Sequence, residues 1–185
     1  MPYLPMTLHD LVQGQGMLGD SEMHDYCLQL AEGVCYLHSL QIVHRDLHSE
    51  NVMTTNDRAC LQIIDFGRAT ELPITGTQAT VYKVAYRPPE ILFAQGARVH
   101  RGAWQQGIRP QYGCPADIWA MACIMCFICN GEGPLGDVDE ECACARGMIQ
   151  VLGCPDLILA SQKRWTSFQR RIPVETSYRH QGLEE

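Results

Sequence analysis

The sequence predicts a mainly α-helical protein with a few short β-strands, and three observations support this. Hydrophobic residues make up 46% of the 185 residues, which is enough for one core and one domain. Apolar residues recur at helical spacing over residues 21–38. A nearly continuous apolar run covers residues 118–129, and its length favours a buried helix over a strand. Strand-like runs are few and short, so we expect helices to dominate the fold.

The first quarter of the chain contains two predicted helices. Residues 1–5 are apolar and interrupted by proline, which indicates an extended segment. Residues 8–12 can form one or two helical turns, and residues 13–19 are interpreted as a glycine-rich loop. Ser21 is the expected N-cap of the long helix. The apolar stripe of that helix consists of Met23, Tyr26, Cys27, Leu30, Val34 and Leu37.

A structured loop and a small hairpin are predicted next. Residues 41–51 do not continue the helical pattern and are interpreted as a loop. Two strand-like runs, at residues 51–54 and 60–64, flank Thr-Asn-Asp at residues 55–57, which is a turn signal. We therefore expect two short strands to pair across this turn.

The rest of the chain alternates irregular segments with helices. Residues 67–89 are rich in Thr, Pro and Gly, which predicts an irregular loop, and a short helix is expected at residues 89–94. Residues 97–113 are polar and resemble a surface insertion. Two further helices are predicted at residues 116–129 and 140–152, the second ended by glycine and proline. We find no internal repeat.

The composition argues against several classes of function. The net charge is −7 and the sequence has no basic block, so nucleic acid is not an expected partner. The longest apolar run has 12 residues, whereas crossing a bilayer takes about 20, so no membrane span is expected. Ten cysteines occur without a secretory signal before them, so reduced, mostly buried thiols are the expected state. We expect a cytoplasmic or nuclear location.

An ordered set of polar residues carries the strongest chemical signal. His44-Arg45-Asp46 is followed five residues later by Asn51, and Asp65-Phe66-Gly67 comes directly after an apolar strand. This set resembles the catalytic loop and the metal-binding motif of eukaryotic protein kinases, and its spacing makes a chance match improbable. The resemblance implies the C-terminal lobe of a protein kinase: mainly helical, with short β-hairpins under the catalytic cleft.

The resemblance also implies a role for each residue of the motif. Asp46 would accept the proton of the substrate hydroxyl or hold that hydroxyl in line. Asn51 and Asp65 would hold Mg²⁺, which prefers oxygen ligands. His44 would pack the loop rather than carry a proton, and Phe66 and Gly67 would allow the segment to pivot. The expected reaction is phosphoryl transfer from ATP to serine or threonine hydroxyls of a protein substrate.

Two downstream motifs agree with this resemblance. Residues 86–92, Tyr-Arg-Pro-Pro-Glu-Ile-Leu, resemble the motif that closes the activation segment, and they point to the cyclin-dependent and MAP kinase group. Glu90 is the structural glutamate of that motif. Asp117, at the start of the apolar helix, resembles the aspartate that braces the catalytic loop. This group makes a cyclin-like or other regulatory protein an expected partner.

The activation segment is expected at residues 65–90. Arg45 and Arg87 resemble receivers for a phosphorylated or acidic group. The candidate phosphorylation sites are Thr77, Thr80 and Tyr82, together with Thr75, and no one of them stands out. Unmodified loop residues remain an equally acceptable interpretation.

The resemblance extends to the start of the chain. Residues 1–7 look like a kinase hinge, in which the backbone of Pro2 and Leu4 would face adenine and Met53 would form the apolar floor. We expect residues 1–160 to be the C-lobe portion of a kinase domain, and residues 161–185 to be a weakly ordered tail or a truncated end. The glycine-rich loop, the Val-Ala-Ile-Lys strand and its partner glutamate are not found, so we expect the N-lobe to be absent and autonomous activity to be weak.

Two substitutions within the motifs leave the activity open. His48 replaces the lysine expected in serine/threonine kinases, and a neutral histidine would supply less charge to the transferring phosphoryl group. Lys83 stands where a threonine normally ties the substrate loop to the catalytic aspartate. The chain is therefore either part of an active kinase whose sequence is incomplete, or a non-catalytic, pseudokinase-type binding module.

The cysteine run on the apolar helix suggests a third possibility. Cys123, Cys126 and Cys129 are spaced three residues apart, so all three thiols are expected on one helix stripe. A metal site is one interpretation of such a run. Packing of small thiols in the core is the favoured interpretation, because cysteine is among the most buried residue types.

Overall fold

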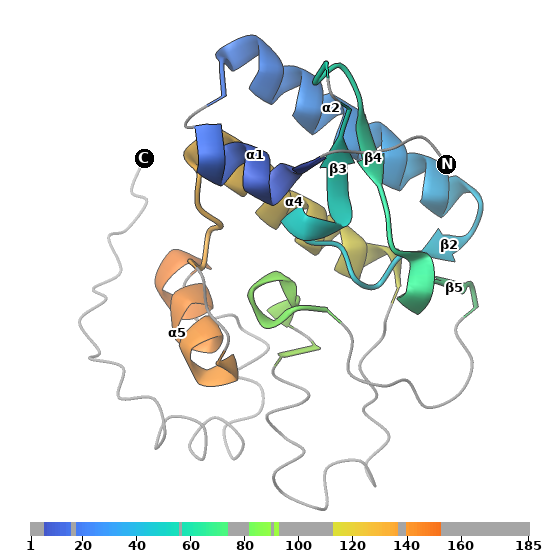
Figure 1. The fold of residues 1–185 in the computed structure, drawn as a ribbon. Helices are drawn as coiled ribbons and strands as arrows, with labels where there is room; N and C mark the ends of the chain where they lie inside the picture. The colour runs from blue at the N-terminus through green and yellow to red at the C-terminus, as the bar shows by residue number, and fades with distance from the viewer. Residues whose placement is uncertain are drawn as a thin grey trace, which may run out of the picture.

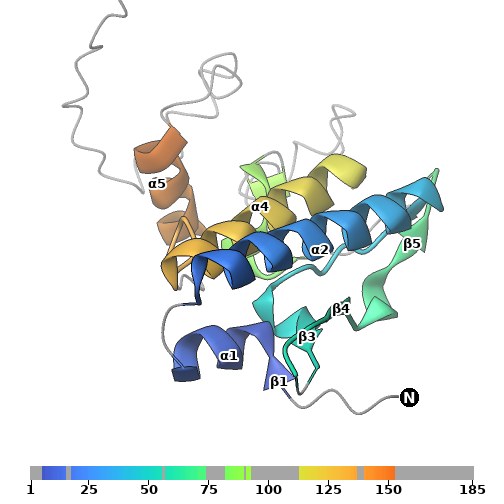
Figure 2. The same cartoon turned by 90° about the horizontal axis from the view of Figure 1, so that it is seen from above.

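Two long helices form the centre of the fold. Helix α2 (Asp20–Ser39) and helix α4 (Cys114–Asn130) lie side by side and run in opposite directions, as both views show (Figures 1 and 2). Buried side chains of both helices belong to one apolar cluster. The prediction of a mainly helical fold with two such helices is confirmed, at bounds close to the expected ones.

The structure, a computed structural model, describes residues 6–15, 18–55, 57–73, 82–89, 91–92, 113–136 and 140–152. The predicted extended segment at 1–5, nearly all of the insertion and the tail at 161–185 lie outside these ranges. Within them, no helix combines the length and apolar composition that a membrane span requires. The remaining elements are β1 (Met6–Thr7), α1 (Leu8–Gln15), β2 (Ile42–Val43), β3 (Val52–Thr54), β4 (Leu61–Ile63), β5 (Thr70–Glu71), α5 (Glu141–Leu152) and 3-10 turns at Ser49–Asn51, Phe66–Arg68 and Val84–Tyr86.

Two small antiparallel sheets position the loops. The first has the order β1-β3-β4, with Val52 opposite Ile63, and it confirms the predicted pairing of the two strand-like runs. The second sheet pairs β2 with β5, so the chain just before the 44–51 loop is joined to the chain just after Asp65. This second pairing was not predicted, because two-residue strands leave almost no sequence pattern.

Two helix boundaries differ from the sequence expectation. Helix α1 continues to Gln15, so the glycine-rich loop begins later than predicted. Helix α2 begins at Asp20, its N-cap is Gly19, and no side chain caps it, so the expected N-cap role of Ser21 is wrong. Asp20 and Glu22 lie in the first turn, where negative charge interacts favourably with the helix dipole.

The main core lies between α1, α2, α4 and the loop that follows α2. Its fully buried members include Leu30, Leu47 and Ile124. A second, smaller cluster lies against α5 and contains Leu92, Cys144, Ala145 and Met148. In this cluster the Cys144 thiol donates a hydrogen bond to the carbonyl oxygen of Val84 at 3.3 Å, which ties α5 to the end of the activation segment.

Gly33 of α2 lies close to the three-stranded sheet. A Cβ atom at this position would lie 3.1 Å from Cδ1 of Ile63 on β4. We predict that Gly33→Val lowers the free energy of unfolding by about 1–3 kcal/mol through overpacking. Gly14→Ala is the matched control, because nothing lies within 4 Å there, and it should leave stability unchanged or raise it by up to about 1 kcal/mol. Equal effects of both variants in urea denaturation would contradict this packing.

Candidate active site

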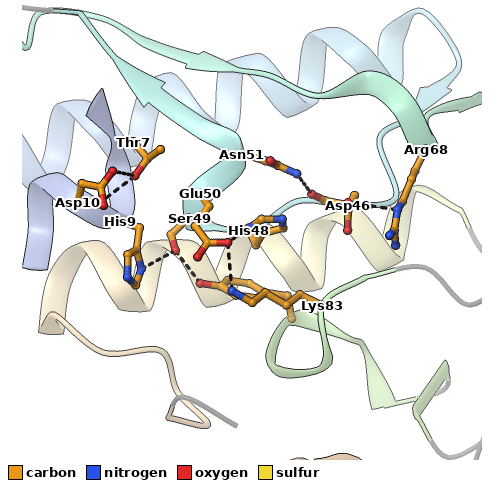
Figure 3. Close-up of polar contacts among 11 residues, drawn as sticks. Thr7, His9, Asp10, Asp46, His48, Ser49, Glu50, Asn51, Arg68 and Lys83 are labelled. Carbon is orange, nitrogen blue, oxygen red and sulfur yellow. Dashed lines mark hydrogen bonds and ion pairs between the residues drawn. The ribbon is translucent and has the colours of Figure 1, made fainter. Parts of the chain in front are cut away.

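The β3–β4 hairpin brings two of the predicted metal ligands to the same end of a sheet. Asn51 directly precedes β3 and Asp65 follows β4 by two residues. The backbone N–H of Ile64 donates to the carbonyl oxygen of Asn51 at 2.9 Å, which continues the strand pairing to this end. The side-chain amide of Asn51 donates to the carbonyl oxygen of Asp46 at 2.8 Å (Figure 3). The hairpin therefore gathers Asp46, Asn51 and Asp65 around one loop.

Asp117 accepts hydrogen bonds from the backbone of this loop. Its carboxylate accepts the backbone N–H of His44 at 2.7 Å and that of Arg45 at 2.9 Å. It also accepts the Tyr82 hydroxyl at 3.1 Å, and Nε2 of His38 lies 3.1 Å away. Asp117 is fully buried at the start of α4. These contacts are what the predicted bracing role requires.

His44 is buried, and both of its ring nitrogens are used by the loop. Nε2 donates to the carbonyl oxygen of Ile64 at 2.9 Å, and Nδ1 accepts the backbone N–H of Asp46 at 3.3 Å. These partners require the neutral tautomer with its proton on Nε2. The Phe66 ring, 47% exposed, packs edge-on against the His44 ring at 5.0 Å. His44 is therefore placed to pack the loop and not to exchange protons.

The unusual backbone of the Asp-Phe-Gly motif lies at Asp65 and not at Gly67. Asp65 has a φ of 59°, a left-handed conformation that aspartate tolerates better than most residues. Its Oδ1 accepts the backbone N–H of Gly67 at 3.1 Å. A Cβ at position 67 would lie only 3.0 Å from that oxygen. In this conformation the turn uses the small size of Gly67, and the expectation that Phe66 and Gly67 allow the segment to pivot stays a prediction.

His48 lies between the loop and the end of the activation segment. Its side chain is 12% exposed, and its ring packs against Tyr86 at 5.9 Å. Nδ1 lies 3.5 Å from Oε2 of Glu50, whose other partner is the Lys83 ammonium at 3.1 Å (Figure 3). Burial lowers the pKa of His48, and Lys83 and His44 lower it further, against the opposing effect of Asp46 and Glu50. His48 is therefore neutral at pH 7.

The lowered pKa of His48 predicts a pH-dependent stability. Above pH 6.5, its ordinary value, both the folded and the unfolded chain carry a neutral His48. Below that value the unfolded chain takes up a proton that the folded chain resists, so stability falls as the pH falls. The free energy of unfolding should drop less between pH 7.5 and 5.5 in His48→Gln than in the wild type. Equal drops in chemical denaturation would contradict the buried, neutral state.

The two expected phosphate receivers are largely buried arginines. Arg45 is 7% exposed, has a φ of 69°, and follows His44 in the braced loop. Arg87 is 5% exposed, and its Nη2 donates to the carbonyl oxygen of Tyr82 at 3.1 Å. Their role as receivers stays a prediction, because Thr77 and Thr80 lie outside the described residues.

Tyr82 does not fit a phosphorylation switch in this conformation. Only 2% of Tyr82 is exposed, and its hydroxyl donates to the buried carboxylate of Asp117. A phosphate on this oxygen would meet a like charge inside the protein, where repulsion is strong. The structure instead places Tyr82 as a link between the activation segment and Asp117.

The other predicted site residues have mixed positions. Met53 lies on the central strand of the three-stranded sheet, opposite Thr7 and Gln62, and is half-buried. Its expected place under adenine stays a prediction, because Pro2 and Leu4 lie outside the described residues. Glu90 lies outside them as well.

Three contacts at the site were missed by sequence reasoning. Nε of Arg68 lies 3.4 Å from Oδ2 of Asp46, although 22 positions separate them in the sequence. The Ser49 hydroxyl and the Tyr86 hydroxyl are 3.0 Å apart, and Lys83 pairs with Glu50. The only available signal was the unusual residue type at positions 48 and 83, which indicated altered contacts without identifying the new partners.

The cysteine run on α4 does not form one stripe. Cys123 is buried, Cys126 is half-buried and Cys129 is exposed. Residues three apart are rotated by about 60° from one another, so the third thiol has left the buried face. In the stretches that the structure describes, no group of three or more His, Cys, Asp or Glu side chains is arranged to hold a metal ion.

Comparison with known proteins agrees with this geometry. The family model of the protein kinase domain matches residues 1–175. The chain is 34% identical over 146 residues to cyclin-dependent kinase 20 of Rattus norvegicus, covering 76% of the chain and 37% of that protein. It is 32% identical over 145 residues to the mitogen-activated protein kinase pmk-3 of Caenorhabditis elegans, covering 77% of the chain and 27% of that protein.

A third relative is a yeast protein. The chain is 31% identical over 131 residues to the probable serine/threonine-protein kinase HSL1 of Saccharomyces cerevisiae, covering 70% of the chain and 8% of that protein. The chain thus spans well under half the length of the curated relatives it matches. The relatives include a probable serine/threonine kinase, and the family model covers nearly the whole chain. The chain therefore belongs to the protein kinase family of transferases.

Proposed function

We propose that this chain is the C-terminal lobe of a protein serine/threonine kinase, which transfers a phosphoryl group from ATP to protein hydroxyls. The observation that carries the proposal is the gathering of Asp46, Asn51 and Asp65 around one loop that Asp117 braces from below. Phosphoryl transfer needs little covalent chemistry and depends on positioning and charge neutralisation. A braced loop with oxygen ligands at its end supplies both.

Asp46 is the group that receives the substrate hydroxyl. Its side chain is 13% exposed, so part of it is reachable from solvent. The Asn51 amide fixes the Asp46 carbonyl, and the Asp46 N–H is held by His44, so the backbone on both sides of the carboxylate is fixed. A fixed carboxylate can hold the hydroxyl in line and accept its proton.

The donor set fits Mg²⁺. Because the Asn51 amide nitrogen donates to Asp46, its oxygen remains as an acceptor, and Asp65 adds a carboxylate; both are the hard ligands that this ion prefers. Bound Mg²⁺ would neutralise charge on the ATP phosphates. Asn51 and Asp65 would hold the ion, and Pro2, Leu4 and Met53 would line the adenine side.

We assign the chain to the cyclin-dependent and MAP kinase group. Identity to cyclin-dependent kinase 20 and to pmk-3 over more than three quarters of the chain supports this, as does the Tyr-Arg-Pro-Pro-Glu motif at residues 86–90. On this assignment a protein substrate is required, a cyclin-like protein is a candidate regulator, and a cytoplasmic or nuclear location follows. Arg45 and Arg87 are the proposed receivers of a phosphate on Thr77 or Thr80.

A non-catalytic binding module is the second candidate. It is favoured by the neutral, buried His48 where a charged side chain is expected, and by Lys83 pairing with Glu50. Such a module would keep the fold and bind partners without transferring phosphate.

Phosphotransfer from labelled Mg-ATP to mixed protein substrates, followed by identification of the labelled amino acid, separates these candidates. The full-length gene product that contains this chain should label serine or threonine. Labelling of tyrosine alone would overturn the serine/threonine assignment. Retained Mg-ATP binding without any labelling would favour the binding module.

A further inference from the structure

The catalytic loop carries acidic groups but no lysine or arginine on its exposed side, because its single arginine, Arg45, is 7% exposed. Asp46 and Glu50 contribute two carboxylates, and the side chain of His48 between them is only 12% exposed. A phosphoryl group in transfer carries negative charge that a site must offset with preorganised positive groups. The described cations that contact this part of the loop come from elsewhere in the chain: Arg68 and Lys83 (Figure 3).

We propose that Arg68 and Lys83 supply the positive charge for the phosphoryl group, in place of a cation at position 48. The proposal rests on the function proposed above and deepens it. Both residues belong to the activation segment at residues 65–90 and not to the loop itself. They approach the loop from two places, Arg68 beside Asp46 and Lys83 beside Glu50, with His48 between these acids in the sequence.

Arg68 follows Asp65 closely in the sequence and contacts Asp46 in space. It is three residues beyond Asp65, at the end of the 3-10 turn that Asp65 caps, and its Nε is 3.4 Å from Oδ2 of Asp46. The side chain is 52% exposed, so the guanidinium can move within the site. A planar guanidinium binds phosphate oxygens through two N–H groups at once, which a histidine cannot do.

Lys83 occupies the other side of the loop. Its ammonium is 3.1 Å from Oε2 of Glu50, and that same oxygen is 3.5 Å from Nδ1 of His48. Ser49 and Tyr86, whose hydroxyls are 3.0 Å apart, join the loop to the short turn that follows Lys83.

Lys83 can leave its carboxylate at low cost, whereas Arg68 is held by a carboxylate that is only 13% exposed. Lys83 and Glu50 are 40% and 46% exposed, and exposed ion pairs contribute only about 0–1 kcal/mol. A phosphate carries more charge than one carboxylate and offers several acceptor oxygens. The carboxylates therefore hold the cations near the site until a phosphate arrives.

Titration with inorganic phosphate, followed by the NMR signals of the Arg68 and Lys83 side chains, tests the proposal without requiring catalysis. Phosphate should shift both signals. Arg68→Gln and Lys83→Met should each weaken phosphate binding by about threefold to tenfold. His48→Lys in the Lys83→Met background should restore binding, since it returns a cation to the loop. Asp46→Asn should strengthen binding by removing a repelling charge.

Arg58→Gln is the matched control, because Arg58 is 37% exposed and pairs with Glu22 at 3.6 Å on another surface. Phosphate affinities of Arg68→Gln and Lys83→Met that equal that of Arg58→Gln would overturn the proposal. This outcome is distinguishable from failure of the proposed function. A protein that binds phosphate through these two residues but transfers none would refute the kinase activity alone.

Discussion

Asp117→Ala should destabilise the protein by about 3–5 kcal/mol, because it removes the one acceptor that several buried donors share. The backbone N–H groups of His44 and Arg45 would lose their partner, and so would the Tyr82 hydroxyl. Whole domains are stable by only about 5–15 kcal/mol, so this loss is a large share of the total. Urea denaturation followed by circular dichroism measures it.

Two controls distinguish the loss of the hydrogen bonds that Asp117 accepts from a general effect of removing a negative charge. Asp117→Asn keeps one acceptor oxygen and should lie between the wild type and Asp117→Ala. Asp25→Ala removes a carboxylate that is 61% exposed and should change stability by less than about 0.5 kcal/mol. If Asp117→Ala were no more destabilising than Asp25→Ala, the loop would not depend on the carboxylate of Asp117.

Asp65→Asn should lower phosphotransfer by at least about 100-fold while leaving the fold intact. Asparagine tolerates the left-handed backbone at this position and can still accept the N–H of Gly67, so the turn survives. What is lost is the negative charge that would hold Mg²⁺. The measurement is kcat/KM for ATP as a function of Mg²⁺ concentration, together with the free energy of unfolding.

The dependence on Mg²⁺ identifies the cause of this loss. In Asp65→Asn, activity should rise with Mg²⁺ at concentrations that already saturate the wild type. Gly67→Ala is an informative comparison, because a Cβ there would press against Oδ1 of Asp65 and displace the carboxylate without removing it. An unchanged Mg²⁺ dependence in Asp65→Asn would show that Asp65 holds no metal ion.

Local patterns were enough to predict the helices and the motif. The stripe that includes Tyr26, Leu30 and Val34 repeats every three to four residues, and this spacing fixes one buried face of α2. Asp46, Asn51 and Asp65 could be found because each keeps a fixed distance along the chain from its neighbours in the motif. These features depend on residues close in sequence, which is why one sequence reveals them.

Contacts between distant segments could not be predicted in the same way. Tyr82 was a plausible phosphorylation site in the sequence. Its hydroxyl contacts Asp117, which is 35 positions away, and no local pattern predicts such a contact. The pairing of Arg68 with Asp46 depends on the small sheet of β2 and β5, whose strands are too short to show a pattern. The N-cap of α2 differed because acidic residues in the first turn stabilise a helix start that no side chain caps.

The rate of phosphotransfer by the full-length gene product, compared between wild type and Asp46→Asn, tests the central claim most directly. Asparagine keeps the shape of Asp46, whose backbone groups bond His44 and Asn51, but it cannot accept a proton from the substrate hydroxyl. The account predicts a loss of about 100-fold to 10,000-fold in kcat with unchanged stability. Equal rates for the two proteins would show that Asp46 does not position the substrate hydroxyl or accept its proton, and the proposed kinase mechanism would be wrong.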